Sequence, residues 1–240
     1  MFQSQASIEH AHPPGLVVAG SQATSQLEQL FRNEHAQRRR LRAHETIFRA
    51  GQQRHALYFV HAGCIRTSIL TDDGREKITG FRLRGELLGL DAIDMQTYAC
   101  DAVSLDVGEV LELPIARLPH ASSALHECIT STLAAEIRRD WRWMLATGTL
   151  TADQRVAEFL VDMGKRLETL GFSPRQLLLR MTRAEIGNYL GLTLETVSRQ
   201  ISALKRDGVI TLEGNRHVQI PDLDRLLEEA GDDSDGGMLV

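Results

Sequence analysis

Three polar side chains in the last third of the chain have the types and the spacing to read DNA bases. They lie in the stretch MTRAEIGNYLGLTLETVSRQISALKRDGVI at 181–210, where Glu195, Ser198 and Arg199 would share one face of a helix. Arginine can donate to O6 and N7 of guanine, glutamate can accept a hydrogen bond from N4 of cytosine, and serine can bond to base edges of either strand. The trio therefore indicates contact with a DNA major groove. The alternative is an ordinary helical hairpin with a Glu195–Arg199 surface pair.

Two helices joined by a tight turn would hold these side chains in place. Thr182 and Glu185 have the spacing of a capping box at the start of the first helix, and Gly191 can end that helix in a left-handed turn. Thr193 can cap the second helix, and Gly208 would end it.

The second helix would bury one face and expose the other. Val197, Ile201 and Leu204 recur at intervals of four and three residues, which turns the polar trio and Ser202 toward solvent. The stretch VITLEGNRHVQI at 209–220 then alternates around a Gly-Asn turn, as a two-stranded hairpin does. This order predicts a winged helix-turn-helix, whose second helix fits a major groove about 12 Å wide.

The charge is unevenly distributed along the chain. The net charge is −5 at pH 7, but residues 175–217 have seven basic and four acidic side chains and carry +3, which leaves −8 for the remainder. A basic surface on an acidic protein suits DNA, because cations that neutralise phosphates release condensed counterions. Judged by charge alone, the alternative to a DNA-binding surface is an ordinary charged face in contact with solvent. The side chains expected at the DNA are Arg183, Thr193, Glu195, Thr196, Ser198, Arg199, Ser202, Lys205 and Arg216.

The segment before these helices has a different pattern. Between residues 46 and 114, short apolar segments such as ALYFVHAG and EKITGFRL are separated by Gly and Asp turns, which predicts an antiparallel β-roll or barrel. About 30 helical residues follow and would form a rod of about 45 Å. In it Leu133, Ile137 and Met144 follow the spacing by which two helices pack along their length, with Asp140 between the last two. We therefore expect this helix to pack along its length against a partner.

Three stretches resemble one known family. EIGNYLGLTLETVSR at 185–199 resembles the helix-turn-helix signature of the Crp/Fnr regulators, and GELLGLDAI and YFVHAGCIRTSILTDDGREKITGF resemble the β-roll of the fumarate-nitrate-reduction branch. The resemblance covers about 41–220 and implies a homodimeric transcription factor. By this resemblance Glu195, Ser198 and Arg199 match the base-reading residues of the branch. Leu194 stands where the cyclic-AMP receptor has an arginine, which favours a TTGAT half-site over TGTGA.

The expected fold class is α+β, with an N-terminal antiparallel β-roll that is similar to a cyclic-nucleotide-binding domain, a long dimerisation helix and a C-terminal winged helix-turn-helix. The expected bounds are a flexible tail at 1–25, the β-roll sensor domain at 26–114, the dimerisation helix at 115–148, the DNA-binding domain at 149–228 and a flexible tail at 229–240. A second capping box, Thr151 and Gln154, begins the DNA-binding domain.

Two further roles are implied by the resemblance. The turn TDDGR at 71–75 resembles an activating loop, which implies that Asp72, Asp73, Gly74 and Arg75 contact RNA polymerase; a plain hairpin tip is the alternative. The branch also has an aspartate at the position of Asp140, where two facing carboxylates would weaken a parallel dimer. In the alternative arrangement the helix is rotated, so that Asp140 lies in solvent and Trp141 makes the contact.

The sequence argues against the cofactors of the family. An iron–sulfur cluster needs four thiolates, but the chain has only Cys64, Cys100 and Cys128, in unrelated spacing, and Leu111 stands at the branch's roll cysteine. We expect these cysteines to be small buried apolar side chains, with a redox-active thiol as the alternative.

Cyclic-AMP binding in the usual mode is not expected. The Gly-Glu-Leu turn is present at 85–87, but no Lys or Arg lies between Arg84 and Arg117, while four aspartates do: Asp91, Asp94, Asp101 and Asp106. A cyclic phosphate would lack its charge-assisted hydrogen bonds. Glu86 is then expected to be a turn and solubility residue.

Other classes of protein receive little support. No metal-ligand set or catalytic motif is recognisable, so we expect neither a metal site nor an enzyme. There is no apolar run of the about 18–20 residues that a membrane span needs, no secretory signal pattern and little cysteine, which predicts a cytoplasmic protein. A ligand-binding module that signals through protein contacts and an architectural DNA-binding protein remain alternatives. The effector, the target genes and the choice between activation and repression are left open.

Overall fold

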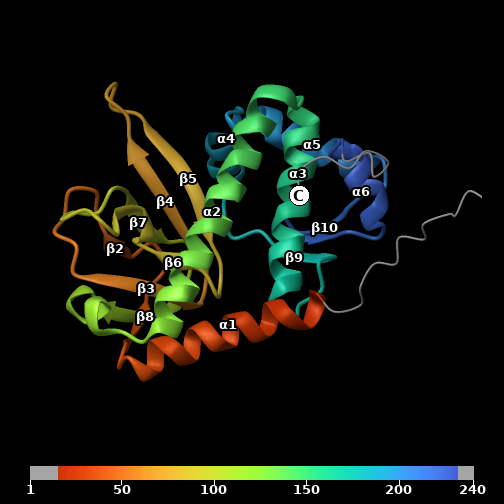
Figure 1. The fold of residues 1–240 in the computed structure, drawn as a ribbon. Coiled ribbons are helices and arrows are strands. Elements are labelled where there is room, and N and C mark those ends of the chain that lie inside the picture. Colours follow the sequence, from red (N-terminus) through yellow and green to blue (C-terminus); the bar gives the residue numbers. More distant parts are fainter. Residues whose placement is uncertain (1–15, 232–240) are drawn as a thin grey trace, which may run out of the picture.

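The first part of the chain is a roll of two four-stranded antiparallel sheets (Figure 1). The structure is a computed structural model that describes residues 16–231. One sheet has the order β1 (Gln37–Leu41), β8 (Gly108–Pro114), β3 (Ala56–Ala62) and β6 (Leu87–Leu88). The other has the order β2 (Thr46–Phe48), β7 (Asp101–Ser104), β4 (Ile65–Leu70) and β5 (Glu76–Arg82). The predicted antiparallel roll is confirmed.

Strand β3 shows why this segment of the sequence is almost continuously apolar. Successive side chains of a strand point to opposite faces. Tyr58 and Val60 lie in the core between the sheets, whereas Leu57 and Phe59 pack in a second buried cluster with residues of the first two helices. The outer face of this sheet is therefore also covered by the protein itself.

The first helix, α1 (Leu16–Asn33), corrects the expected flexible tail at 1–25. Leu27 and Phe31 are buried, and an ion pair of 2.7 Å joins Glu28 to Arg32 one turn apart. These residues lie just beyond the predicted tail, so the packing that stabilises the helix could not be inferred from the composition of the tail itself. Residues 1–15 of the expected tail lie outside the described residues.

The long helix, α2 (Ser123–Thr149), begins later than residue 115, where the dimerisation helix was expected to start. Residues Ile115–His120 form a 3₁₀ helix, η2, which contains Pro119. Ser122 then caps α2, since its hydroxyl accepts a hydrogen bond from the Leu125 N–H at 3.4 Å. The first turns of α2 bury Leu125 and Ile129 against the roll.

The C-terminal domain contains helices α3 (Ala152–Thr169), α4 (Arg183–Leu190), α5 (Leu194–Arg206) and α6 (Leu223–Glu229). A small sheet has the order β10 (Thr211–Glu213), β11 (His217–Gln219) and β9 (Gln176–Leu178). The hairpin of β10 and β11 is the predicted wing, whereas β9 was not predicted. Helix α6 ends at Glu229, one residue past the predicted domain, and 232–240 of the second expected tail lie outside the described residues.

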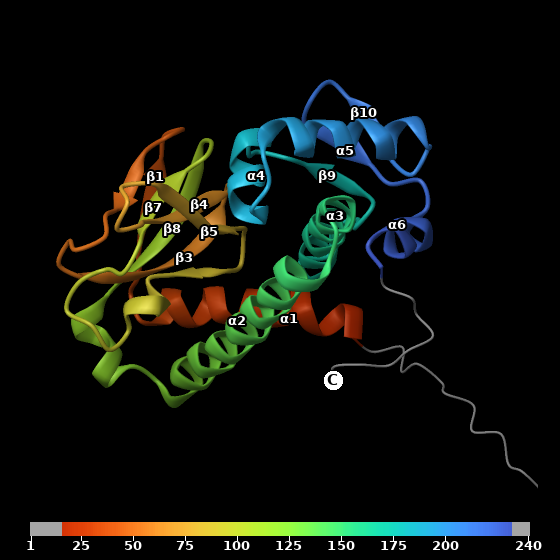
Figure 2. The same ribbon diagram turned by 90° about the horizontal axis from the view of Figure 1, so that it is seen from above.

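The roll and the C-terminal domain share one buried apolar cluster. It contains Ile78, Phe81 and Leu83 of the roll together with side chains of α3 such as Val156 and Phe159. Helix α1 extends along the roll and reaches α3 in both views (Figures 1 and 2). Among residues 16–231, no helix has the length and apolar content to span a membrane.

Candidate nucleic-acid interface

The turn between α4 and α5 is fixed by the residues that the sequence indicated. At the start of α4 the Glu185 N–H donates to the Thr182 hydroxyl at 3.2 Å, and the Thr182 N–H donates to the Glu185 carboxylate at 2.7 Å. Gly191 ends α4 with φ of 69°, a left-handed conformation that costs glycine little. The Thr196 N–H donates to the Thr193 hydroxyl at 3.2 Å at the start of α5. Both predicted caps and the glycine turn are confirmed.

Gly187 is a determinant of this turn that sequence reasoning missed. A Cβ atom at this position would lie 2.7 Å from the Leu192 carbonyl oxygen and 3.2 Å from the Thr193 carbonyl carbon. The chain after α4 therefore packs directly on the α4 backbone. The small residue in the middle of an otherwise ordinary helical pattern was the available signal.

Helix α5 presents Glu195, Arg199 and Ser202 to solvent as predicted, whereas Ser198 is half-buried. Val197, Ile201 and Leu204 are buried, whereas Glu195 and Arg199 are exposed. Among the described residues, neither of these two charged side chains has a hydrogen-bond or ion-pair partner. The alternative of a Glu195–Arg199 surface pair is therefore not formed, and both groups are available to a ligand.

The other polar side chains of α5 are partly engaged by the helix itself. The Thr193 and Thr196 hydroxyls lie 3.0 Å apart, and the Ser202 hydroxyl donates to the Ser198 carbonyl at 2.8 Å. Ser198 is half-buried, while Ser202 and Lys205 are exposed. These residues line the same side of the domain as Glu195 and Arg199.

The wing is attached to the start of α4 by an arginine. The Arg183 guanidinium donates to the Asn215 carbonyl at the wing tip at 3.0 Å, and burial lowers the pKa of Arg183. Gly214 beside it has φ of 61°. Arg216 is exposed, and its carbonyl accepts from the Leu179 N–H at 2.8 Å. Arg183 thus has a structural partner within the domain in addition to its expected place near the DNA.

The turn at 71–75 is an exposed tip between β4 and β5. The Thr71 N–H donates to the Arg75 carbonyl at 2.9 Å, and Gly74 has φ of 79°. Asp73 forms an ion pair of 2.8 Å with Arg75, and hydrogen bonds from the Thr71 hydroxyl and the Arg75 N–H lower the pKa of Asp73. Its predicted position on a turn is confirmed.

Helix α2 exposes apolar side chains beyond the roll. Ile137 and Met144 are 49% and 66% exposed, which is unusual for large apolar groups. Asp140 is also exposed. Leu133 differs from this set because it is half-buried against the cluster that α2 shares with the roll. Exposed Trp141 and Leu145 extend the apolar stripe.

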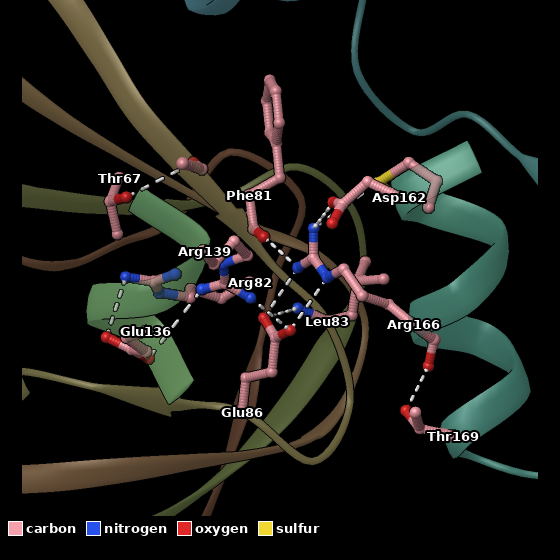
Figure 3. Close-up of polar contacts among 12 residues, drawn as sticks. Thr67, Phe81, Arg82, Leu83, Glu86, Glu136, Arg139, Asp162, Arg166 and Thr169 are labelled. Carbon is pink, nitrogen blue, oxygen red and sulfur yellow. Dashed lines mark hydrogen bonds and ion pairs between the residues drawn. The ribbon is translucent and has the colours of Figure 1, made fainter. Parts of the chain in front are cut away.

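Glu86 lies in a partly buried ion cluster, which corrects the expectation that it is a turn and solubility residue. Its carboxylate accepts both Nε and Nη2 of Arg166, at 2.9 and 2.7 Å, and Nη1 of Arg139 at 3.0 Å (Figure 3). The Leu83 N–H donates to it at 3.0 Å. The sequence-based error arose because Arg139 and Arg166 lie 53 and 80 residues away along the chain.

Comparisons with known proteins agree with this architecture. Residues 38–121 match the cyclic nucleotide-binding domain family, and residues 154–229 match the Crp-like helix-turn-helix domain family. The chain is 40% identical over 201 residues to the transcriptional activator protein anr of Pseudomonas aeruginosa, covering 82% of each protein. The chain belongs to the Crp/Fnr family of transcription regulators.

Two other Crp/Fnr proteins show how widely the likeness extends. The fumarate and nitrate reduction regulatory protein of Escherichia coli K12 is 35% identical over 190 residues, which is 78% of this chain and 76% of that protein. The structure of FixK2 from Bradyrhizobium japonicum superposes with a TM-score of 0.74 at 30% identity, over 85% of this chain and 99% of that one. The family and its fold are therefore those that the resemblance implied.

The Crp/Fnr roll of this chain contains a cavity of about 280 Å³ between its sheets and α2. Arg82 contributes the only guanidinium among the residues that line it, and this group donates to Glu136 at 3.3 Å. Asp91 and Asp140 also line the cavity. The sequence did not point to Arg82, because it lies on β5, before the segment between Arg84 and Arg117 in which a phosphate-binding cation was expected. The cavity has more carboxylates than cations.

The three cysteines of this Crp/Fnr chain lie in three different apolar clusters. Cys64 belongs to the cluster that joins the two domains, Cys100 to the roll interior, and Cys128 packs against the cluster under α2. Burial raises the pKa of Cys64 to about 12 and also raises that of Cys100. These two thiols therefore stay protonated at neutral pH and serve as small apolar side chains.

Proposed function

We propose that the protein is a homodimeric regulator that reads a palindromic TTGAT-like DNA site with α5. The observation that carries this proposal is the exposed face of α5, on which Glu195 and Arg199 have no partner within the described residues. Arg199 would donate to guanine, Glu195 would accept from cytosine, and Ser198 would bond to a neighbouring base. Leu194, 47% exposed at the start of α5, would contact the groove beside them.

The side chains around this trio would set the position of the helix on the duplex. Phosphate contacts carry no sequence information but fix the register of the protein on DNA. Hydroxyl and basic groups at the ends of α4 and α5 and on the wing supply such contacts: Arg183, Thr193, Thr196, Ser202, Lys205 and Arg216. The guanidinium of Arg183 would contribute while also supporting the wing.

Dimerisation would use the exposed stripe of α2. Ile137 and Met144, with Trp141, are large apolar groups that a second copy of the helix would cover. A two-fold axis along α2 would bring the two α5 helices to half-sites about one helical turn, 34–36 Å, apart. Asp140 would then face its own copy and weaken the pairing. Leu133 would lie at the roll end of this seam.

The exposed turn with Asp72 and Asp73 is proposed to contact RNA polymerase. Two observations support this role: the turn is the exposed tip of the β4–β5 hairpin (Figure 1), and the Pseudomonas relative is named a transcriptional activator. Gly74 gives the turn its left-handed residue, and Arg75 holds Asp73 in place through their ion pair.

The family cofactors do not fit the residues of this chain, and we infer that the signal is of another kind. Cys64, Cys100 and Cys128 lie in separate apolar clusters, where they cannot together ligate one [4Fe–4S] cluster, and a fourth cysteine is lacking. The two oxygens of Glu86 already accept four N–H groups, so a nucleotide ribose would have to displace them. The protein is further proposed to be cytoplasmic, without a metal site and without catalytic activity.

A competition gel shift tests the proposed function against its alternatives. A palindromic TTGAT…ATCAA duplex should be retained in the presence of random competitor DNA. Equal retention of duplexes of any sequence, decreasing as the salt concentration rises, would indicate an architectural DNA-binding protein. No retention of any duplex would indicate a module that signals through protein contacts.

Arg199→Ala should weaken binding to the specific duplex by about 1–3 kcal/mol. The difference in affinity between this duplex and random DNA should therefore become smaller. Equal weakening of both complexes would reduce Arg199 to a phosphate contact. Leu194→Arg should move the preference toward TGTGA, and an unchanged preference would contradict the role given to Leu194.

A further inference from the structure

A partly buried ion cluster lies where the roll, the long helix and the DNA-binding domain meet (Figure 3). The roll contributes two residues, α2 contributes two and α3 contributes two, and their charges are three positive and three negative. The members are Arg82, Glu86, Glu136, Arg139, Asp162 and Arg166.

Glu86 is the residue that joins the three parts directly. Its bidentate pair with Arg166 connects the loop after β5 to α3, and its bond with Arg139 connects the same loop to α2. Bidentate arginine–carboxylate pairs fix direction as well as distance. Arg166 also donates to the Phe81 carbonyl of β5 and, at 3.3 Å, to Asp162. Nε and Nη2 of the Arg166 guanidinium therefore bond to the roll, while Nη1 bonds to Asp162 on the same helix and holds the guanidinium in place.

Glu86 and Arg166 keep their charges although the site is partly buried. Burial alone would raise the pKa of Glu86, but the positive charges of Arg166, Arg139 and Arg82 outweigh it and hold this pKa at about 2. Burial acts on Arg166 in the opposite direction, and the carboxylates of Glu86 and Asp162 outweigh it, so that the pKa of Arg166 is raised. Glu86 and Arg166 are therefore both ionised at neutral pH.

Four aromatic rings beside the ion cluster hold the same elements together. Phe81 of β5, Trp143 of α2, Phe159 of α3 and Tyr189 of α4 form a set in which neighbouring ring centres lie 5.2–6.5 Å apart. Apolar contact keeps the elements close but has little directional preference. The ion pairs of Glu86 add directional bonds between the roll, α2 and α3, and the hydrogen bonds of Asn188 add further ones between β5 and α4.

We propose that Glu86 is a positioning residue for DNA binding, which sets the direction in which the DNA-binding domain leaves α2. In the structure with these ion pairs in place, Glu195, Arg199 and Ser202 on the polar face of α5 are exposed. A dimer gains affinity from two half-sites only when both α5 helices are held at the spacing of the sites. This proposal rests on the proposed function, because it requires a dimer that binds two half-sites.

The double variant Glu86→Gln with Arg166→Met tests this proposal. It removes the ion pair and replaces both partners by neutral groups of similar size, so that neither charge of the pair is left without the other. Asp162 and Arg139 each lose one partner in this variant, and for that reason Arg166→Lys, which keeps a cation beside Asp162, is measured in parallel. The matched control is Arg38→Met with Glu109→Gln, which removes a pair joining β1 to β8 inside the roll. Affinity is measured for the full palindrome and for a duplex with one half-site, and hydrogen exchange is followed at the Ile78 amide, which bonds across the domain boundary to Asn188.

The double variant should bind one half-site within about twofold of the wild type but lose at least about tenfold on the palindrome. Exchange at Ile78 should accelerate, and the control variant should match the wild type in all three measurements. Arg166→Lys keeps the charge but not the bidentate geometry, so it should give an intermediate loss on the palindrome and also serves if the double variant does not fold.

Wild-type affinity of the double variant for the palindrome would overturn the proposal. Equal losses on the palindrome and the half-site would also overturn it, since they would mean damage within the DNA-binding domain itself. If the wild type binds no specific DNA, the proposed function fails separately. Unchanged Ile78 exchange in the variant would in that case still refute the positioning role of Glu86.

Discussion

Asn188 of α4 caps the open edge of β5 as a neighbouring strand would. Its side-chain oxygen accepts the Ile78 N–H at 2.7 Å, and its side-chain nitrogen donates to the Glu76 carbonyl at 2.8 Å. Asn188→Ala would remove both bonds. The Lys77 ammonium, which donates to the Asn188 and Tyr189 carbonyls, would keep its partners because these are backbone groups.

The expected cost of this change can be worked out bond by bond. Each lost hydrogen bond contributes about 1 kcal/mol, and alanine recovers about 0.5 kcal/mol through its higher helix propensity. The free energy of the local opening that separates α4 from β5 should therefore fall by about 1.5 kcal/mol. Such a difference corresponds to about a tenfold change in the equilibrium for local opening.

Native-state hydrogen exchange measures that equilibrium directly. The Ile78 amide should exchange about tenfold faster in Asn188→Ala, because each 1.4 kcal/mol is a factor of ten. Asn188→Asp keeps an acceptor for this N–H and should leave it largely protected. Unchanged exchange at Ile78 in the alanine variant would refute the view that Asn188 closes the boundary between the domains.

Three further outcomes are expected. Asp140→Ala should tighten dimerisation and strengthen DNA binding, because two facing carboxylates about 4 Å apart repel by about 1 kcal/mol in water and about 4 at an effective dielectric of 20; equal dimer constants in sedimentation across a dilution series would contradict this. Alanine at Asp72 and Asp73 should reduce transcription in vitro while DNA affinity stays constant, and a loss of both would indicate misfolding instead. The pKa of Glu86 is lowered from 4.5 to about 2, so its ionised form stabilises the fold above pH 4.5 and this contribution is lost as the pH falls toward 2. The difference in unfolding free energy between wild type and Glu86→Gln, measured with urea, should therefore shrink over that window, and a constant difference would rule out ionisation of Glu86 as its source.

The helix-turn-helix could be predicted in detail because its determinants are local. Each cap joins residues three apart, as with Thr182 and Glu185, and the glycine turn and the buried stripe of α5 also fall within a short window of sequence. Short-range rules of helix start, end and periodicity suffice for such a unit. The wing hairpin followed from the same kind of signal.

The contacts between domains could not be predicted because their partners are distant in sequence. Nothing near Glu86 indicates that its counterions are Arg139 and Arg166, and a carboxylate in a turn is usually solvated. Helix α1 was missed for a related reason, since its stability comes from burying Leu27 and Phe31 against the rest of the chain. Whether the expected base-reading and polymerase-contacting residues have these roles stays a prediction.

The hydrogen bonds of Asn188 also affect how a fragment with only one half of the chain would behave. β5 is the last strand of its sheet, and exposed strand edges invite pairing with other molecules. A fragment that ends with α2 would present the Ile78 N–H and the Glu76 carbonyl to solvent, together with the apolar surface left by Phe159 and Tyr189. The C-terminal half of the chain thus covers an edge and an apolar surface of the roll that would favour self-association, and the roll is poorly suited to transplantation as an independent module.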